Sequence, residues 1–214
     1  MKNWQDGKPD KKKFHERMND VIIFLEKQVD VSKLHALEVF GRGGDWHTTV
    51  YANKVKSLQV WEIDKKWKNI LKKNLPNAKI KIRDSIKTIV ENLEPSKFDL
   101  VIIDNPMNTW GTKKEPDLYC EHFDFIKNIG NIMGKETIII FNINKNPFNY
   151  DEFPEWKKRR EKFYERKRTS KLSPRFLIKF YKKLFLKNGY KTVFQKLFRR
   201  EEHLDYFVFF LRKK

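Results

Sequence analysis

Short apolar runs alternate with amphipathic stretches along most of the chain. The apolar runs, which we interpret as strands, are residues 34–40, 58–61, 78–82, 98–103 and 137–141. The stretches between and before them, which we interpret as helices, are residues 11–29, 46–55, 65–74, 85–93 and 118–132. Near-continuously apolar strands that alternate with helices are typical of a parallel sheet covered on both faces.

The last quarter of the chain follows a different pattern. Residues 174–187 are predicted as a helix that the Asn-Gly pair at 188–189 ends. Residues 190–198 and 204–211 are predicted as strands, and the short charged turn at 199–203 joins them. So short a connection requires an antiparallel pair. The expected fold class is therefore α/β: a three-layer, mostly parallel sheet with a C-terminal antiparallel hairpin.

The composition favours one folded domain over residues 1–214, with a tail and a helix at 1–33. The chain is 39% hydrophobic, and its 18 Phe and 6 Trp can supply a core. The single cysteine, Cys120, excludes a disulfide framework and favours a reducing compartment. Residues 1–13 do not resemble a signal peptide, and no apolar run approaches the ~20 residues of a membrane span. We therefore expect a cytoplasmic protein.

Three features follow the first three predicted strands, at the edge where open α/β sheets bind ligands. Glu38 and the turn Gly41-Arg42-Gly43-Gly44 end the first strand, and glycines let the backbone approach a ligand closely. Glu62 ends the second strand, where a carboxylate can accept hydrogen bonds from both hydroxyls of a ribose. Asp84 ends the third strand and can accept from an adenine amino group. The ordinary alternatives are a tight turn, a solvated acid and a helix cap.

The glycine turn does not match the loops that bind a pyrophosphate. A G-x-G-x-x-G motif from Gly41 would need glycine at Trp46, and one from Gly43 would need glycines at Asp45 and Thr48. The Gly-Lys-Ser/Thr sequence of a P-loop is also absent. The three features therefore predict an adenosine slot without a pyrophosphate, which points to S-adenosylmethionine. No metal site is expected.

With these residues, the chain resembles class I (Rossmann-like) S-adenosylmethionine-dependent methyltransferases from about Leu34 to the C-terminus. The resemblance implies a seven-stranded sheet with one antiparallel strand, reached through a terminal hairpin. The fourth motif, Asp104-Asn105-Pro106-Met107, resembles the Asp/Asn-Pro-Pro-Tyr/Phe motif of enzymes that methylate exocyclic amines, with Met107 at the second proline. The cofactor-binding residues that the resemblance implies are Glu38, Gly41, Gly43, Gly44, Glu62, Asp84 and Asp104.

The methylated atom decides which side chains do the chemistry. An amine acceptor needs hydrogen-bond acceptors beside it, and Asp104, Asn105 and the carbonyl of Pro106 are candidates. A hydroxyl acceptor needs a general base, for which His47, His122 and Asp104 are candidates. The alternatives are a helix cap for His47 and a place on an amphipathic helix face for His122.

Residues 146–173 are the most unusual stretch, because basic and aromatic residues are interleaved there. Nine basic and two acidic residues lie between Lys157 and Lys171. This pattern suits phosphate contacts and base stacking, and its alternative is a solvated basic helix over an apolar patch. The resemblance implies that residues 145–173 form an insertion or lid over the acceptor. The predicted nucleic-acid contacts are Lys157, Lys158, Arg159, Arg160, Arg166, Lys167 and Arg168.

The net charge of +19 has two interpretations. One is a polyanionic partner, either a nucleic acid or an anionic membrane surface, and the other is an AT-rich genome that enriches lysine codons. Three functions therefore stay open. The chain is a methyltransferase of nucleic acid (RNA more than DNA), a methyltransferase of a sugar, glycan or other small molecule, or a non-catalytic Rossmann-like module that binds nucleic acid.

Overall fold

The computed structural model describes residues 11–104, 122–145, 154–200 and 204–214. The strands are β1 (His35–Glu38), β2 (Ser57–Glu62), β3 (Lys79–Ile82), β4 (Phe98–Ile103), β5 (Met133–Asn144), β6 (Tyr190–Arg199) and β7 (Leu204–Lys213). The α-helices are α1 (Lys11–Glu26), α2 (Lys68–Asn74), α3 (Ser85–Val90), α4 (Phe123–Lys127), α5 (Pro154–Tyr164) and α6 (Pro174–Lys187). Short 3₁₀ turns are η1 (Val31–Lys33), η2 (Thr48–Val50), η3 (Lys65–Trp67) and η4 (Ile129–Asn131).

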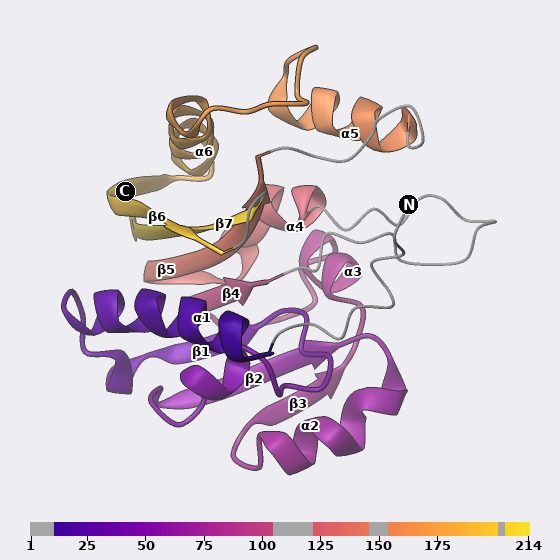
Figure 1. Cartoon of the computed structure of the whole chain (residues 1–214), viewed down its shortest axis with the longest axis vertical. Helices are drawn as coiled ribbons and strands as arrows, with labels where there is room; N and C mark the ends of the chain where they lie inside the picture. The colour runs from indigo at the N-terminus through magenta and orange to yellow at the C-terminus, as the bar shows by residue number, and fades with distance from the viewer. Residues whose placement is uncertain (1–10, 105–121, 146–153, 201–203) are drawn as a thin grey trace.

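All these strands belong to one seven-stranded sheet in the order β3-β2-β1-β4-β5-β7-β6 (Figure 1). Strands β1 to β5 are parallel, and β7 runs antiparallel to both of its neighbours, β5 and β6. The predicted fold class is therefore confirmed. The strand order reverses between β1 and β4, and the carboxyl ends of strands at such a switch point form the usual ligand crevice of an open α/β sheet.

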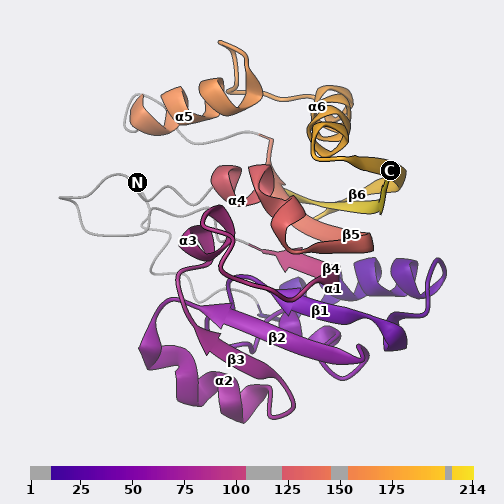
Figure 2. The ribbon, with the colours of Figure 1, turned by 180° about the vertical axis from the view of Figure 1, so that it is seen from behind.

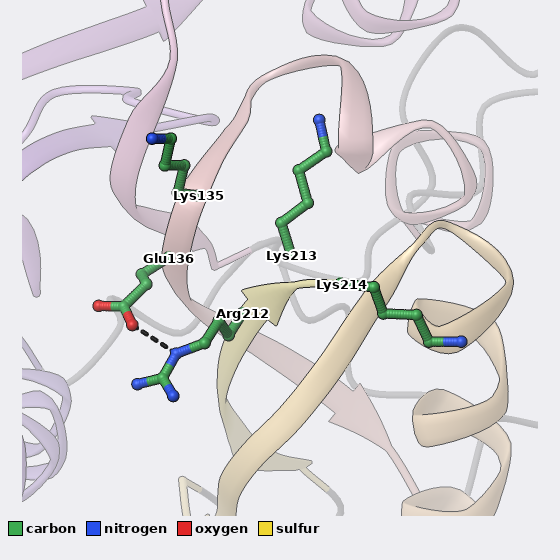
Figure 3. Close-up of a pocket in the computed structure, with 5 residues that line it drawn as sticks. All are labelled: Lys135, Glu136, Arg212, Lys213 and Lys214. Atoms are coloured by element: carbon green, nitrogen blue, oxygen red, sulfur yellow. Dashed lines mark hydrogen bonds and ion pairs between the residues drawn. The ribbon is translucent and has the colours of Figure 1, made fainter.

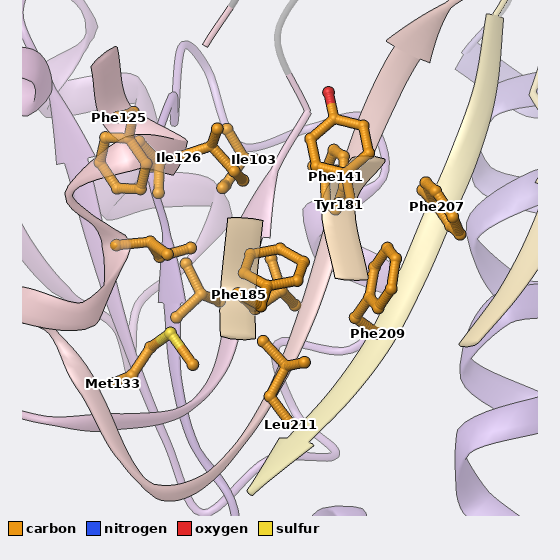
Figure 4. Packing of buried hydrophobic residues seen from close by; sticks show 14 of the residues in the cluster. Ile103, Phe125, Ile126, Met133, Phe141, Tyr181, Phe185, Phe207, Phe209 and Leu211 are labelled. Atoms are coloured by element: carbon orange, nitrogen blue, oxygen red, sulfur yellow. The ribbon is translucent and has the colours of Figure 1, made fainter. Parts of the chain in front are cut away.

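Helices cover both faces of the sheet, which explains why its strands are apolar on both sides. In β4, Leu100 and Ile102 pack with the core beneath α1 and α2, whereas Val101 and Ile103 pack with the core beneath α3, α4 and α6. Figure 1 shows α1 in front of the sheet, and Figure 2 shows α3 and α4 on the opposite face. Aromatic rings fill much of the second core, where Tyr181 of α6 packs against the strands (Figure 4).

Two predicted helices are wrong in extent. Residues 46–55 form only the 3₁₀ turn η2 and irregular turns, because Thr48, Thr49 and Val50 are β-branched and disfavour an α-helix. Of the helix expected at 118–132, residues 118–121 lie outside the described ranges, and the rest divides into α4 and η4. Gly130 lies in η4, where its lack of a side chain weakens helix formation.

Helix caps explain several boundaries. The cap of α3 is Asp84, whose carboxylate accepts from Lys87 N at 3.0 Å. Ser85, the next residue, is buried and donates to Val39 O at 2.7 Å. The α6 helix coincides with its prediction, since Ser173 caps its start and Gly189 leaves it with φ +85°. No helix in the described part of the chain is long and apolar enough to cross a membrane.

Candidate functional site

The glycine turn lies against β2 and α2. A Cβ at Gly41 would lie 2.2 Å from Val60 Cγ1, and one at Gly44 would lie 2.6 Å from Leu75 Cδ1. Gly44 also has φ +66°, a region that favours glycine. Packing and backbone conformation therefore account for Gly41 and Gly44, as the tight-turn interpretation expects, and their contact with a ligand stays a prediction.

Arg42 fixes the middle of this turn through stacking. Its guanidinium lies 4.5 Å from the ring centroid of Trp46 and 5.3 Å from that of Trp67. Trp46 in turn stacks on Phe14 of α1, with the ring centroids 5.5 Å apart. Cation–π and aromatic contacts thus connect the N-terminal helix to the glycine turn.

Glu62 ends β2 directly beside the turn, and its side chain is only 6% exposed. Its two carboxylate oxygens accept from the backbone N–H groups of Arg42 at 2.6 Å and of Asp64 at 2.8 Å. A carboxylate has about four lone-pair positions, so each oxygen keeps capacity for one more donor. The two backbone donors therefore orient Glu62 and leave it able to bind a pair of hydroxyls.

Asp84 is placed at the end of β3, as predicted, but it is exposed and caps α3. The helix-cap interpretation of this residue is therefore confirmed. Only one of its oxygens accepts from Lys87 N, so contact of the other with an adenine amino group stays a prediction.

His47 lies between two buried carboxylates from different strands. Its Nε2 is 3.1 Å from Glu38 Oε2 at the end of β1. Its Nδ1 is 3.2 Å from Oδ2 of Asp104, which directly follows β4; this contact is close enough for an ion pair but is not aligned as a hydrogen bond. The side chain caps no backbone N–H of η2, so the helix-cap alternative is wrong. Tyr51 also donates its hydroxyl to Glu38 Oε2.

Two further side chains, both from the C-terminal part of the sequence, contact Asp104. Tyr206 of β7 donates to Asp104 Oδ2 at 2.6 Å. Arg200, which directly follows β6, places Nη2 3.0 Å from Asp104 Oδ1. All these side chains are at most 6% exposed. We call this set the buried polar cluster: Glu38, His47, Tyr51, Asp104, Arg200 and Tyr206.

Burial and charge set the protonation states in the cluster. Burial alone would lower the pKa of His47, but Glu38 and Asp104 outweigh it and raise that pKa. Burial, with the neighbouring carboxylates, raises the pKa values of Tyr51 and Tyr206 well above the usual 10. Both phenols are therefore neutral donors, and His47 tends toward the imidazolium form.

His122 begins α4 beside β5, with its ring centroid 5.3 Å from that of Phe141. The side chain is 2% exposed, and neither ring nitrogen has a hydrogen-bond partner in the part of the chain that the structure describes. Burial, aided by the charge of Arg160, lowers the pKa of His122 to about 3. A neutral imidazole with so low a pKa is a weak general base at neutral pH. Asn105 and Pro106, the other predicted acceptor contacts, lie outside the described residues.

The basic segment contains a helix, α5, whose aromatic residues point inward. Trp156, Phe163 and Tyr164 are at most 3% exposed, so they are not available to stack on bases, and for these three rings that expectation is wrong. Arg160 is fully buried and donates to the backbone carbonyls of Asn144 and Thr169 at 3.2 and 3.4 Å. It therefore lies outside the predicted nucleic-acid surface. The other basic residues named for that surface are exposed: Lys157, Lys158, Arg159, Arg166, Lys167 and Arg168.

Tyr51, Arg200 and Tyr206 belong to the buried polar cluster, although no motif in the sequence marks them as site residues. Tyr206 lies within an apolar strand and looks like an ordinary core aromatic, and Arg200 lies in a charged turn. Arg200 and Tyr206 are each about 100 residues from Asp104 in the sequence. A polar-tipped side chain inside an otherwise apolar strand is the weak signal that could have found Tyr206.

A pocket lies at the opposite edge of the sheet, away from the cluster (Figure 3). It is lined by Lys135 and Glu136, near the start of β5, and by the last three residues of the chain. Arg212 Nε donates to Glu136 Oε1 at 2.5 Å there. The amino ends of parallel strands are not where open α/β sheets bind ligands, so we assign this pocket no role.

No protein-family model matches the sequence, and no curated protein matches it significantly. Solved structures do match it. Magnesium protoporphyrin IX methyltransferase from Synechocystis PCC 6803 with bound S-adenosylhomocysteine has a TM-score of 0.58 at 12% identity, covering 94% of this chain and 84% of that one. N-methyltransferase NodS from Bradyrhizobium japonicum has a TM-score of 0.56 at 12% identity, covering 98% and 91%.

A protein from Pyrococcus horikoshii, provisionally assigned as an RNA methyltransferase, has a TM-score of 0.52 at 13% identity, covering 92% of this chain and 84% of that one. At these identities the likeness concerns the fold. The chain therefore has the fold of class I S-adenosylmethionine-dependent methyltransferases, as the sheet order and the terminal hairpin also indicate.

Proposed function

We propose that the protein is an S-adenosylmethionine-dependent methyltransferase that acts on a nucleic acid, RNA more than DNA. The main support for this proposal is the set of polar groups at the carboxyl edge of β1, β2 and β4. Glu38, the glycine turn, Glu62 and Asp104 lie there in the order that the fold uses for an adenosine cofactor.

The residues at this edge fit the cofactor on three counts. Glu62 is held by two backbone amides and retains lone pairs for the two hydroxyls of a ribose. Among the described residues, Glu38 Oε1 is buried and has no hydrogen-bond partner. The ammonium of the cofactor's methionine portion would supply the missing donor, which a buried carboxylate oxygen needs. Ile63, which directly follows Glu62, is 47% exposed and can cover one face of an adenine ring.

When bound, S-adenosylmethionine supplies an electrophilic methyl group, and the protein positions the acceptor. Asp104 is held by Arg200 and Tyr206, which fixes its carboxylate at the start of the predicted acceptor motif. Because Oδ2 accepts from Tyr206 and Arg200, and Oδ1 is ion-paired with Arg200, we assign Asp104 to orientation of the acceptor rather than to proton removal. An amine acceptor, which the Asn105-Pro106 resemblance favours, can lose its proton after transfer and needs no strong base.

The location of the positive charge favours a nucleic-acid substrate. Residues 154–189 carry fourteen basic and three acidic residues, a net +11 out of the +19 of the whole chain. Genome-wide codon bias would distribute lysine more evenly. All fourteen except Arg160 are exposed on α5, on α6 and on the segment between them. Exposed cations grouped in this way suit phosphate contacts.

Two measurements test the proposal. Calorimetric titration with S-adenosylmethionine, and with NAD as the control, tests the cofactor; binding of the first alone is expected. Transfer of a labelled methyl group to total RNA, compared with DNA and with a small-molecule extract, tests the substrate class. Binding without transfer to either nucleic acid would favour the small-molecule alternative, and absence of cofactor binding would favour a non-catalytic module.

A further inference from the structure

The imidazole of His47 faces a carboxylate on each side, and this arrangement determines how many of its ring nitrogens carry a proton. A neutral imidazole has one N–H and one lone pair, so one ring nitrogen would direct a lone pair at a carboxylate oxygen. With Glu38 Oε2 at 3.1 Å and Asp104 Oδ2 at 3.2 Å, the imidazolium is the form that is attracted to both. The geometry therefore places a proton on His47.

The charges of the buried polar cluster balance in this state. Glu38 and Asp104 contribute two negative charges, and Arg200 and the His47 imidazolium contribute two positive ones. All four side chains are at most 6% exposed, so water screens them little. A ligand that adds a further positive charge beside His47 would unbalance the cluster, and loss of the His47 proton would restore the balance.

We propose, on the basis of the function proposed above, that the proton on His47 makes the site distinguish S-adenosylmethionine from S-adenosylhomocysteine. The two molecules share the ammonium assigned to Glu38, but only the first has a positive sulfonium, two methylene groups away along the same chain. Both ligands bring the ammonium, but only S-adenosylmethionine adds the sulfonium, so its binding favours neutral His47 and release of the His47 proton more strongly than binding of the neutral thioether does. Proton and sulfonium affinities are linked reciprocally.

His47 is the group whose titration makes the discrimination between the two ligands depend on pH. The charged or titratable groups that face it are Glu38 of β1, Tyr51 after η2, Asp104 after β4, Arg200 after β6 and Tyr206 of β7. Of the side-chain types in this set, imidazole has the ordinary pKa nearest to neutrality. Raising that pKa moves its titration to higher pH.

The test is calorimetric measurement of the dissociation constants of both molecules from pH 6 to 9 for the wild type, His47→Gln and Tyr51→Phe. For the wild type, affinity for S-adenosylmethionine relative to S-adenosylhomocysteine should rise with pH, by at most tenfold per pH unit for one proton. Tyr51→Phe removes another partner of Glu38 and should keep this slope. His47→Gln should lose it and retain only the titration of the ligands' own amino groups, which is the same for every variant.

Equal slopes in the wild type and His47→Gln would overturn the proposal. Because the glutamine variant can fail to fold, a second measurement uses the wild type alone. The His47 ring is titrated by NMR in both complexes, and its pKa should be lower with S-adenosylmethionine. An equal pKa in the two complexes would contradict the proposal while leaving the methyltransferase function intact, whereas failure of both ligands to bind would remove the function itself.

Discussion

Tyr206 of β7 donates a 2.6 Å hydrogen bond to Asp104 at the end of β4, although β5 lies between the two strands in the sheet. The bond connects the antiparallel C-terminal hairpin to Asp104, the first residue of the predicted acceptor motif. Both partners are buried, so water cannot replace either one. The C-terminal hairpin thus completes one side of the sheet and also positions Asp104.

Tyr206→Phe should therefore lower the free energy of unfolding by about 1–3 kcal/mol, because it leaves a buried carboxylate without one donor. Urea denaturation measures this change. Tyr190→Phe is the matched control: its hydroxyl donates to the carbonyls of Met133 and Gly134 at the opposite sheet edge, at 3.3 and 3.2 Å. We expect Tyr206→Phe to weaken methyl transfer as well and Tyr190→Phe to leave it unchanged. Equal activities in the two variants would argue against a positioning role for Tyr206.

Glu62→Ala should weaken S-adenosylmethionine binding by at least about tenfold, the factor that corresponds to 1.4 kcal/mol. The change removes both the ribose acceptor and the group that orders the backbone of Arg42 and Asp64. Asp64→Asn is the control, since the Asp64 carboxylate accepts from Lys66 N at 3.0 Å and pairs with Lys66 Nζ at 2.6 Å. Unchanged cofactor affinity in a folded Glu62→Ala protein would show that the ribose assignment is wrong.

Gly44→Ala should destabilise the fold by about 2 kcal/mol or more, because the new methyl group combines a positive φ with overpacking. Its Cβ would lie 2.6 Å from Leu75 Cδ1. Gly134→Ala, where the nearest atom would be 3.6 Å away, should cost far less. Thermal unfolding of the two variants compares them directly, and similar losses at both positions would contradict the packing described for the glycine turn.

Replacing Arg166, Lys167 and Arg168 with glutamine should weaken RNA binding and flatten its dependence on salt. Loss of three phosphate contacts should reduce the slope of log K against log salt by about 2 to 3. The control removes the same charge from α2, far from α5 in Figure 1, by changing the exposed Lys68, Lys72 and Lys73 to glutamine. Equal effects of the two triple variants on the slope would mean that binding follows total charge and not this surface.

Glu94 should account for part of the decrease in the free energy of unfolding at acid pH. Burial alone would raise its pKa, but Lys81 at 2.6 Å and the backbone and side chain of Ser96 outweigh burial and lower that pKa to about 2. A carboxyl whose pKa is depressed on folding stabilises the protein above its unfolded pKa, and this contribution is lost as pH falls toward the folded value. Stability should therefore decline between about pH 4.5 and pH 2.

Glu94→Gln should remove that part of the decline and lower stability at pH 7 by an amount on the order of 2 kcal/mol, since Lys81 and Arg83 lose their shared partner. Denaturation at a series of pH values measures both effects. Glu91→Gln, at an exposed position, serves as the control and should leave the acid transition in place. An acid transition that is unchanged in Glu94→Gln would assign it to other carboxyl groups.

Local sequence determined the seven strands and their order along the chain, whereas the helix predicted at 46–55 did not form. The apolar run of β4 was predicted residue for residue, because burial on both faces requires continuous apolar positions. The α6 boundaries followed from Pro174 at its start and Gly189 after its end, since backbone preferences act locally. Glu38, Glu62 and Asp84 could be placed at one sheet edge because parallel strands all end there.

Tertiary structure alone decided what surrounds those residues. Hydrophobic pattern cannot tell that Arg200 and Tyr206 reach Asp104, because contact between distant positions depends on the strand order. Nor does it tell whether the rings of α5 face a ligand or the core, since either arrangement gives the same sequence of basic and aromatic residues. His47 shows the difference most directly: its position beside the glycine turn is local, whereas its two carboxylate partners come from strands that only the folded sheet brings together.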